Sequence, residues 1–200
     1  MAAGNKIQSL QALRAIAFLG IFLFHAGIIW GNFGGFGASV FICLSGFLMT
    51  YTYYNKKIDD GIGSIFKFAI KKIKRLYPLH IITMIVVLLL FIVLALHSST
   101  MTTKYAIDLL LYTLCNIFLV QTWVPIISYN VSLNGVAWYL SVCLVIYFAF
   151  PFLLKVIKKY KSVKSAYIAM ACTYVGMVLI SILTANVKGI DGNFHTWITY

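Results

Sequence analysis

Long apolar runs without a single charge constrain this chain more than any other feature of its sequence. Three of them, at residues 81–96, 138–154 and 166–185, approach the ~20 residues that an α-helix needs to cross a hydrocarbon core about 30 Å thick. Lipid offers no hydrogen bonds, so a helix is the simplest way to satisfy the backbone there. The apolar residues run continuously rather than alternating as in barrel strands. The sequence therefore predicts an all-α fold, a polytopic transmembrane helical bundle.

The charges that remain are strongly positive. The net charge is +12, and only 10% of the 200 residues are charged, against roughly 25% in soluble domains. Most lysines cluster just beyond the apolar runs, as they do in loops that stay in the cytoplasm. A basic chain can also indicate nucleic acid, but no basic groove with aromatic stacking platforms is evident. We therefore expect a lipid bilayer as partner and no nucleic acid.

Cysteine spacing gives no sign of a disulfide framework or of a metal site. The four cysteines are scattered through separate apolar segments, and no C-x-x-C pair occurs. We therefore expect neither disulfides nor a bound metal. The residues are Cys43, Cys115, Cys143 and Cys172.

The N-terminal part predicts a helical hairpin followed by a basic segment. A first helix is expected at about residues 10–30, a glycine-rich bend at 31–37 and a second helix at 38–54. Seven Lys or Arg residues lie within 55–78, which places this segment in the cytoplasm. Its apolar residues recur at helical spacing, which predicts an amphipathic helix on the membrane surface. Pro78 then begins the third long helix, in the first turn, where proline costs least.

Residues 105–123 do not fit the topology as a full membrane span. If they crossed the membrane fully, the five lysines within 155–164 would lie outside, against the usual bias of basic loops. The segment also contains Asp108, Asn116 and Gln121, which are costly in lipid. We therefore predict a re-entrant or partly buried segment, next to about five spanning helices and a cytoplasmic N-terminus.

Two ionisable residues lie inside the first apolar helix, and such residues are candidates for function. Arg14 and His25 are eleven residues apart, so they share one helix face and lie roughly 16 Å apart along the axis. Two plainer interpretations stay open. Arg14 can extend to the cytoplasmic interface, and His25 can be hydrogen-bonded to a neighbouring helix. His80 and His97 are expected to be interfacial.

Ser45 lies near the middle of the second helix, among small residues such as Ala38, Ser39 and Gly46. Small residues at this spacing usually indicate close helix packing. As a nucleophile Ser45 would need a base and a group to orient that base, and no acid lies nearby in sequence. A Ser-His-Asp triad is therefore disfavoured.

Several motifs occur in an order that resembles a known family. They are Leu10–Ala17 (LQALRAIA), Phe24-His25, Phe41–Leu48 (FICLSGFL), Lys74–Leu79 (KRLYPL) and Trp138–Val142 (WYLSV). The first three are similar to the opening of the acyltransferase-3 family of membrane O-acyltransferases. The fourth is similar to its basic Arg-x-x-Pro step, and the fifth to its W-x-L-S-V-E block. The resemblance covers about residues 10–151.

This resemblance implies an acyl-CoA-dependent O-acyltransferase of the bacterial inner membrane. It would transfer an acyl group, commonly acetyl, from cytoplasmic acyl-CoA to a hydroxyl of a cell-envelope or exopolysaccharide carbohydrate, without a permanently bound cofactor. The family's functional residues map onto His25 as the catalytic residue and onto Arg14 and Arg75 as donor-binding residues. These are the only two arginines, and a guanidinium binds phosphate in a bidentate way that lysine does not. Further candidates for the substrate site are Ser45, Trp138 and Ser141.

The chain departs from the family pattern in two ways. Cys143 stands where the family usually has Glu, and the family generally has about ten helices. We therefore expect residues 1–200 to form a single membrane acyltransferase domain that is incomplete at its C-terminus. Two other functions stay open: a transporter in which Arg14 and His25 line an anion or proton path, and a non-catalytic membrane partner.

Overall fold

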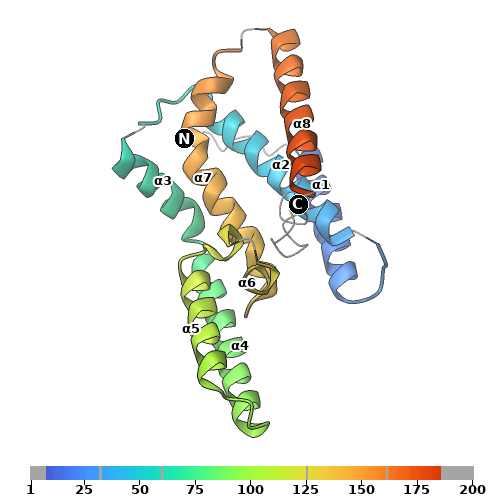
Figure 1. The fold of residues 1–200 in the computed structure, drawn as a ribbon. Helices are drawn as coiled ribbons and strands as arrows, with labels where there is room; N and C mark the ends of the chain where they lie inside the picture. The colour runs from blue at the N-terminus through green and yellow to red at the C-terminus, as the bar shows by residue number, and fades with distance from the viewer. Residues whose placement is uncertain (1–7, 32, 60, 125, 161, 186–200) are drawn as a thin grey trace. The chain divides into compact units, whose positions relative to one another are not determined.

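A computed structural model describes residues 8–31, 33–59, 61–124, 126–160 and 162–185, which contain helices and no β-strand. The chain divides into two compact units, residues 1–58 and 59–199, and each is described here by itself. In chain order the elements are α1 (Gln8–His25), α2 (Phe33–Tyr53), α3 (Ile62–Ile73), α4 (Tyr77–His97), α5 (Thr103–Ile117), η1 (Gln121–Trp123), α6 (Ile127–Asn130), η2 (Gly135–Ala137), α7 (Trp138–Ile157) and α8 (Val163–Ala185) (Figure 1).

Four stretches of helix in the described residues are long and apolar enough to cross a membrane. They are Phe33–Tyr53, Tyr77–His97, Gly135–Ile157 and Val163–Ile180. Helix α1 is apolar too but shorter, and it stands in the place of the first predicted span. Helix α5 has 15 residues, about 22 Å at the helical rise, which is less than the hydrocarbon thickness. The predicted all-α membrane bundle is confirmed, and the re-entrant or partly buried character of α5 stays a prediction.

The first unit is the predicted hairpin of α1 and α2, but its bend is placed differently. Helix α1 ends at His25 rather than near Trp30, because Gly27 closes it with a φ of 69°. The N–H of Gly27 donates to the Phe24 carbonyl at 3.1 Å, and the N–H of Ile28 to the Leu23 carbonyl at 3.0 Å. This pair of bonds is a Schellman C-cap, which requires the left-handed backbone that glycine adopts readily.

Gly31 lies in the connection with a φ of 100°, as expected for the bend, but Gly34, Gly35 and Gly37 lie instead inside α2, which begins at Phe33. A methyl group on Gly37 would lie 2.5 Å from Cγ1 of Ile21 and 2.8 Å from the carbonyl oxygen of Ala17. A methyl group on Gly34 would lie 2.6 Å from the ring of Phe24. The prediction of a bend was wrong at these positions, because the glycines allow two helices to approach closely.

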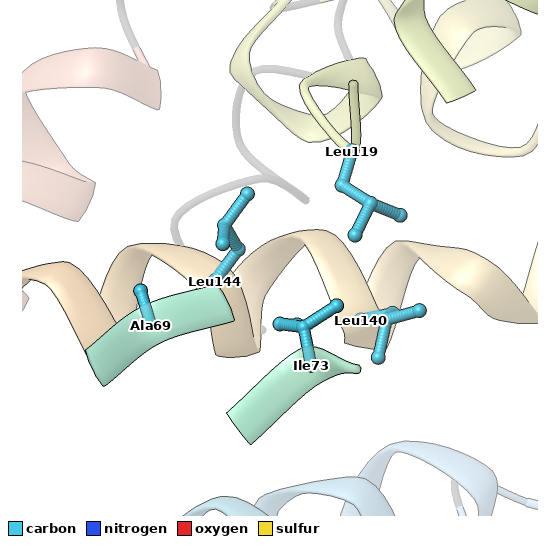
Figure 2. Close-up of a cluster of buried hydrophobic side chains, with 5 residues drawn as sticks. All are labelled: Ala69, Ile73, Leu119, Leu140 and Leu144. Carbon is cyan, nitrogen blue, oxygen red and sulfur yellow. The ribbon is translucent and has the colours of Figure 1, made fainter. Parts of the chain in front are cut away.

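In the second unit, α3 packs along α7 through apolar side chains. Figure 2 shows the contact: α3 carries Ala69 and Ile73, α7 carries Leu140 and Leu144, and Leu119 approaches from the loop after α5. Ring contacts extend it, with the centroids of Phe66 and Phe148 5.0 Å apart and those of Phe68 and Phe150 5.7 Å apart. Helix α3 is amphipathic as predicted, and one side of its apolar surface packs against α7.

Helices α4 and α5 lie side by side in the same unit (Figure 1). Pro78 sits in the first turn of α4, as predicted. The hydroxyl of Thr102 accepts the N–H of Tyr105 at 3.2 Å and so caps the N-terminus of α5. Met84, Leu109 and Leu133 form the buried cluster beside this pair, so the polar C-terminus of α5 is directed into the protein together with the loop that follows.

Candidate functional site

His25 is the last residue of α1, and its ring orientation is set by the same helix. The ring Nδ1 lies 2.9 Å from the carbonyl oxygen of Ile21. A carbonyl can only accept, so Nδ1 carries the proton and donates, which leaves the lone pair of a neutral imidazole on Nε2. The ring is exposed and meets Phe24 edge-on with centroids 5.3 Å apart. His25 therefore presents Nε2 as a proton acceptor.

Arg14 lies on the same helix, towards its start. Its side chain is half-buried, and its Nε is buried without a hydrogen-bond partner among the described residues. Further along the same helix, the rings of Phe18 and Phe22 stack with centroids 6.5 Å apart. A buried guanidinium N–H without an acceptor is costly, and a phosphate or carboxylate oxygen would satisfy it. Arg14 is therefore available to an anionic ligand.

The packing register of the hairpin separates Ser45 from His25. Gly34 of α2 lies against Phe24, next to His25. Ser45 is eleven residues further along α2, which is about 16 Å at the helical rise. The half-buried Ser45 hydroxyl therefore lies near the level of Arg14. A nucleophile at Ser45 served by His25 is excluded by distance, whereas a substrate contact of Ser45 stays a prediction.

Arg75 belongs to the second unit, in the turn between α3 and α4, and its side chain is exposed. The turn is closed by the N–H of Leu76, which donates to the Ile73 carbonyl at 2.9 Å. This geometry leaves the guanidinium outside the packed core. The convergence of Arg75 with Arg14 on one ligand stays a prediction.

The two α7 candidates differ in accessibility. Ser141 has no exposed surface. Its hydroxyl donates to the Leu119 carbonyl and is paired with the Thr122 hydroxyl, both at 2.6 Å. This favours a structural role for Ser141. Trp138 is half-buried at the start of α7, with its ring edge-on to Tyr139 at 6.1 Å, so it remains the better substrate-site candidate of the two.

Cys143 lies one turn beyond Tyr139 on α7 and is buried, with 4% of its surface exposed. Its thiol contacts the side chains of Tyr139 and Tyr147. A carboxylate at this position would be surrounded by the same two phenol rings, whereas a thiol is a weak hydrogen-bonding group. The site therefore lacks the acid that the resembled family places here.

A buried polar cluster around His80 was missed by the sequence analysis. His80, expected at an interface, is 4% exposed, and its Nε2 donates to the Asn116 carbonyl at 3.0 Å. The Tyr77 hydroxyl donates to the Ile117 carbonyl at 2.9 Å. The last carbonyls of a helix have no partner within the helix. Side chains of α4 thus cap the C-terminus of α5 inside the protein.

Two amides complete this cluster, and both are fully buried. Asn116 donates to the Tyr112 carbonyl at 2.9 Å and to the Ser132 hydroxyl at 2.8 Å. Gln121 donates to the Ala137 carbonyl at 3.2 Å. The acceptors His80 Nδ1, Asn116 Oδ1 and Gln121 Oε1 have no partner among the described residues. The polarity of Asn116 and Gln121 in an apolar segment was the signal for this cluster.

The described residues hold no group of three or more His, Cys, Asp or Glu side chains that could bind a metal ion. The site residues that the structure does describe are a histidine, arginines and hydroxyls. Taken singly, these groups can accept a proton or hold an anion.

The family model for an acyltransferase domain matches residues 7–199. The chain belongs to the acyltransferase-3 family. Its match runs through both units and includes α1, the turn at Arg75 and the start of α7. The family assignment made from the motifs is thereby confirmed.

Relatives in this family carry acyltransferase names. A Staphylococcus aureus (strain COL) protein named "Putative O-acetyltransferase" is 38% identical over 40% of this chain and 13% of its own length. The peptidoglycan O-acetyltransferase OatA of Listeria monocytogenes is 26% identical over 42% of this chain and 13% of its own length. The acyltransferase MdmB of Streptomyces mycarofaciens is 26% identical over 77% of this chain and 41% of its own length. The chain thus matches less than half of each relative's length. No solved structure matches it.

Proposed function

We propose that this chain forms the membrane part of an O-acyltransferase that transfers an acyl group, commonly acetyl, from acyl-CoA to a hydroxyl of a cell-envelope or exopolysaccharide carbohydrate. Membership of the acyltransferase-3 family supports acyl transfer, and the names of the relatives, one of them a peptidoglycan O-acetyltransferase, support oxygen acceptors on carbohydrate. The observation that carries the proposal is His25, whose Nδ1–H is held by the Ile21 carbonyl and whose Nε2 is thereby left as base.

In the proposed reaction, Nε2 of His25 takes the proton of the acceptor hydroxyl as its oxygen attacks the thioester carbonyl. The new carbon–oxygen bond forms, the carbon–sulfur bond breaks, and CoA leaves as a thiolate that the imidazolium can protonate. The Ile21 carbonyl accepts from Nδ1–H throughout and stabilises the charged ring. Covalent transfer through His25 is the variant of this scheme with an acyl-imidazole intermediate.

The donor is proposed to enter from the cytoplasmic side of a bacterial inner membrane. Arg14 offers a buried N–H without a protein acceptor, and Arg75 offers an exposed guanidinium. Both suit the phosphates of CoA, because a guanidinium presents a rigid fork of donors. Arg14 lies about 16 Å from His25 along α1, which leaves room for a donor that extends from phosphate to thioester.

The test is CoA release from acetyl-CoA by the purified full-length protein with a glycan acceptor. We expect His25→Ala to lower turnover by roughly 10²–10⁴, the usual loss of a positioned base. His97→Ala is the matched control, because His97 is exposed at the end of α4. Wild-type turnover in His25→Ala would make His25 a packing residue. Substrate flux without CoA release would indicate a transporter instead.

A further inference from the structure

Helix α3 presents two different apolar surfaces. One consists of Ile65, Ala69 and Ile73, which are buried, and it includes the contact with α7. The other is the strip Ile62, Phe66 and Ile70, whose side chains are 84%, 56% and 50% exposed, although one edge of the Phe66 ring also meets Phe148 of α7. These three residues follow each other at intervals of four, so they form one continuous line along the helix. Packing on α7 therefore uses only part of the apolar surface of α3.

A line of lysines borders the exposed strip on its outer side. Lys67, Lys71 and Lys74 are exposed and lie, at 100° per residue, about a quarter turn beyond the strip. The sequence of α3 contains no acidic residue. The carboxylate of Asp59, just before the helix, accepts the Gly61 N–H at 3.0 Å and the Ser64 hydroxyl at 2.7 Å. The charged side chains that border the strip from Lys67 to the C-cap Lys74 are therefore all positive, and the acid Asp59 lies only at the start of the helix.

We propose that this face of α3 binds the surface of an anionic bilayer, with the strip in the acyl-chain boundary and the three lysines on lipid phosphates. An apolar line flanked by lysines is the pattern of interfacial helices that prefer anionic lipids. The chain is a membrane protein through its long apolar helices, and α3 lies directly before the spanning helix α4. This inference does not depend on the proposed acyl transfer.

The alternative occupant of the strip that this chain could supply is a second copy of itself, and charge argues against it. A protein surface covering Ile62, Phe66 and Ile70 would also have to meet three neighbouring ammonium groups, which the acid-poor composition of this chain, with four Asp and no Glu, does not match. Lipid phosphates match them without a specific partner surface. Lysine side chains can also extend from the apolar boundary to the headgroup level.

The first measurement places a fluorophore on either side of α3. Single-cysteine variants Ile62→Cys and Lys71→Cys are made in a cysteine-free background of the full protein, labelled, and placed in nanodiscs with spin-labelled lipid. We expect strong quenching at position 62 and several-fold weaker quenching at position 71. Equal quenching at both positions would overturn the proposal. A dye at position 62 that is shielded from water but not quenched by lipid would show a protein cover, which also overturns it.

The second measurement tests lipid charge with a matched pair of variants. Lys67→Gln/Lys71→Gln removes two lysines from α3, and Lys159→Gln/Lys164→Gln removes two exposed lysines near the α7–α8 connection. Quenching at position 62 should increase when phosphatidylglycerol replaces phosphatidylcholine in the parent and in the control. The α3 pair should lose this increase. Each lysine that is removed should weaken the binding of this helix to phosphatidylglycerol about fivefold. An unchanged lipid dependence in the α3 pair would overturn the proposal.

Discussion

At the scale of single residues, one backbone carbonyl determines what His25 can do. Residue Ile21 lies one turn before His25, and its carbonyl oxygen accepts from Nδ1 of the ring. The helix ends there because Gly27 forms the C-cap, so His25 sits in the last turn with its ring outside the packed hairpin. The chemistry assigned to Nε2 thus depends on a glycine two residues beyond the histidine.

The two arginines allow a residue-scale prediction that separates charge from geometry. Lysine keeps the charge of arginine but lacks its rigid fork of donors. Arg14→Lys and Arg75→Lys should therefore each weaken acyl-CoA binding roughly ten- to a hundredfold, which corresponds to about 1.5–3 kcal/mol for one charge-assisted contact. Calorimetry on matched detergent preparations measures this, with CoA lacking its 3′-phosphate as the control ligand. If both variants bind as tightly as the parent, the arginines are topological anchors.

At the scale of elements, the hairpin of α1 and α2 depends on glycine where the helices are closest. Gly37→Ala would place a methyl group 2.8 Å from a backbone oxygen that cannot move aside. We expect a loss of about 1–3 kcal/mol in stability, as for other overpacked positions. Gly46→Ala on the same helix meets nothing within 4 Å and should be neutral or slightly stabilising. Thermal unfolding of the two variants in one detergent compares them, and equal melting temperatures would contradict the packing register.

The end of α5 gives a second element-scale prediction. Tyr77→Phe removes the hydroxyl that donates to the Ile117 carbonyl and keeps the ring. A part-buried carbonyl that loses its donor costs up to about 1–3 kcal/mol, so this variant should unfold at a lower temperature than the parent. Tyr51→Phe is the matched control, because Tyr51 is 68% exposed and surface changes stay within about 0.5 kcal/mol. Equal loss in both variants would rule out a capping role for Tyr77.

At the scale of the whole molecule, the basic loops predict topology. Residues 56–75 and 155–164 both carry clustered lysines and should both lie in the cytoplasm. This requires α5 not to cross, which its length of 15 residues, about 22 Å at the helical rise, favours. Lys57→Cys and Lys159→Cys in a cysteine-free background should both resist a membrane-impermeant reagent added from outside. Ready labelling of position 159 alone would mean that α5 spans the membrane.

Much of the element order could be predicted because the bilayer imposes a length and a composition on each span. The positions of α2, α4, α7 and α8 follow from uncharged runs, and the amphipathic α3 follows from helical spacing. The roles of Gly34 and Gly37 could not be predicted in this way. Glycine suits both a bend and a close helix contact, and only the distances to Ile21 and Phe24 distinguish the two.

The sequence by itself determined the family, the membrane-spanning helices and the set of candidate residues, because apolar length, basic loops and ordered motifs are local properties of the chain. The tertiary structure alone decided which polar groups meet. It buried His80 and Ser141 as donors to backbone carbonyls of the α5 end and the loop after it, and it separated Ser45 from His25. Such pairings join residues 22 to 36 positions apart, and no local pattern encodes the register that brings them together.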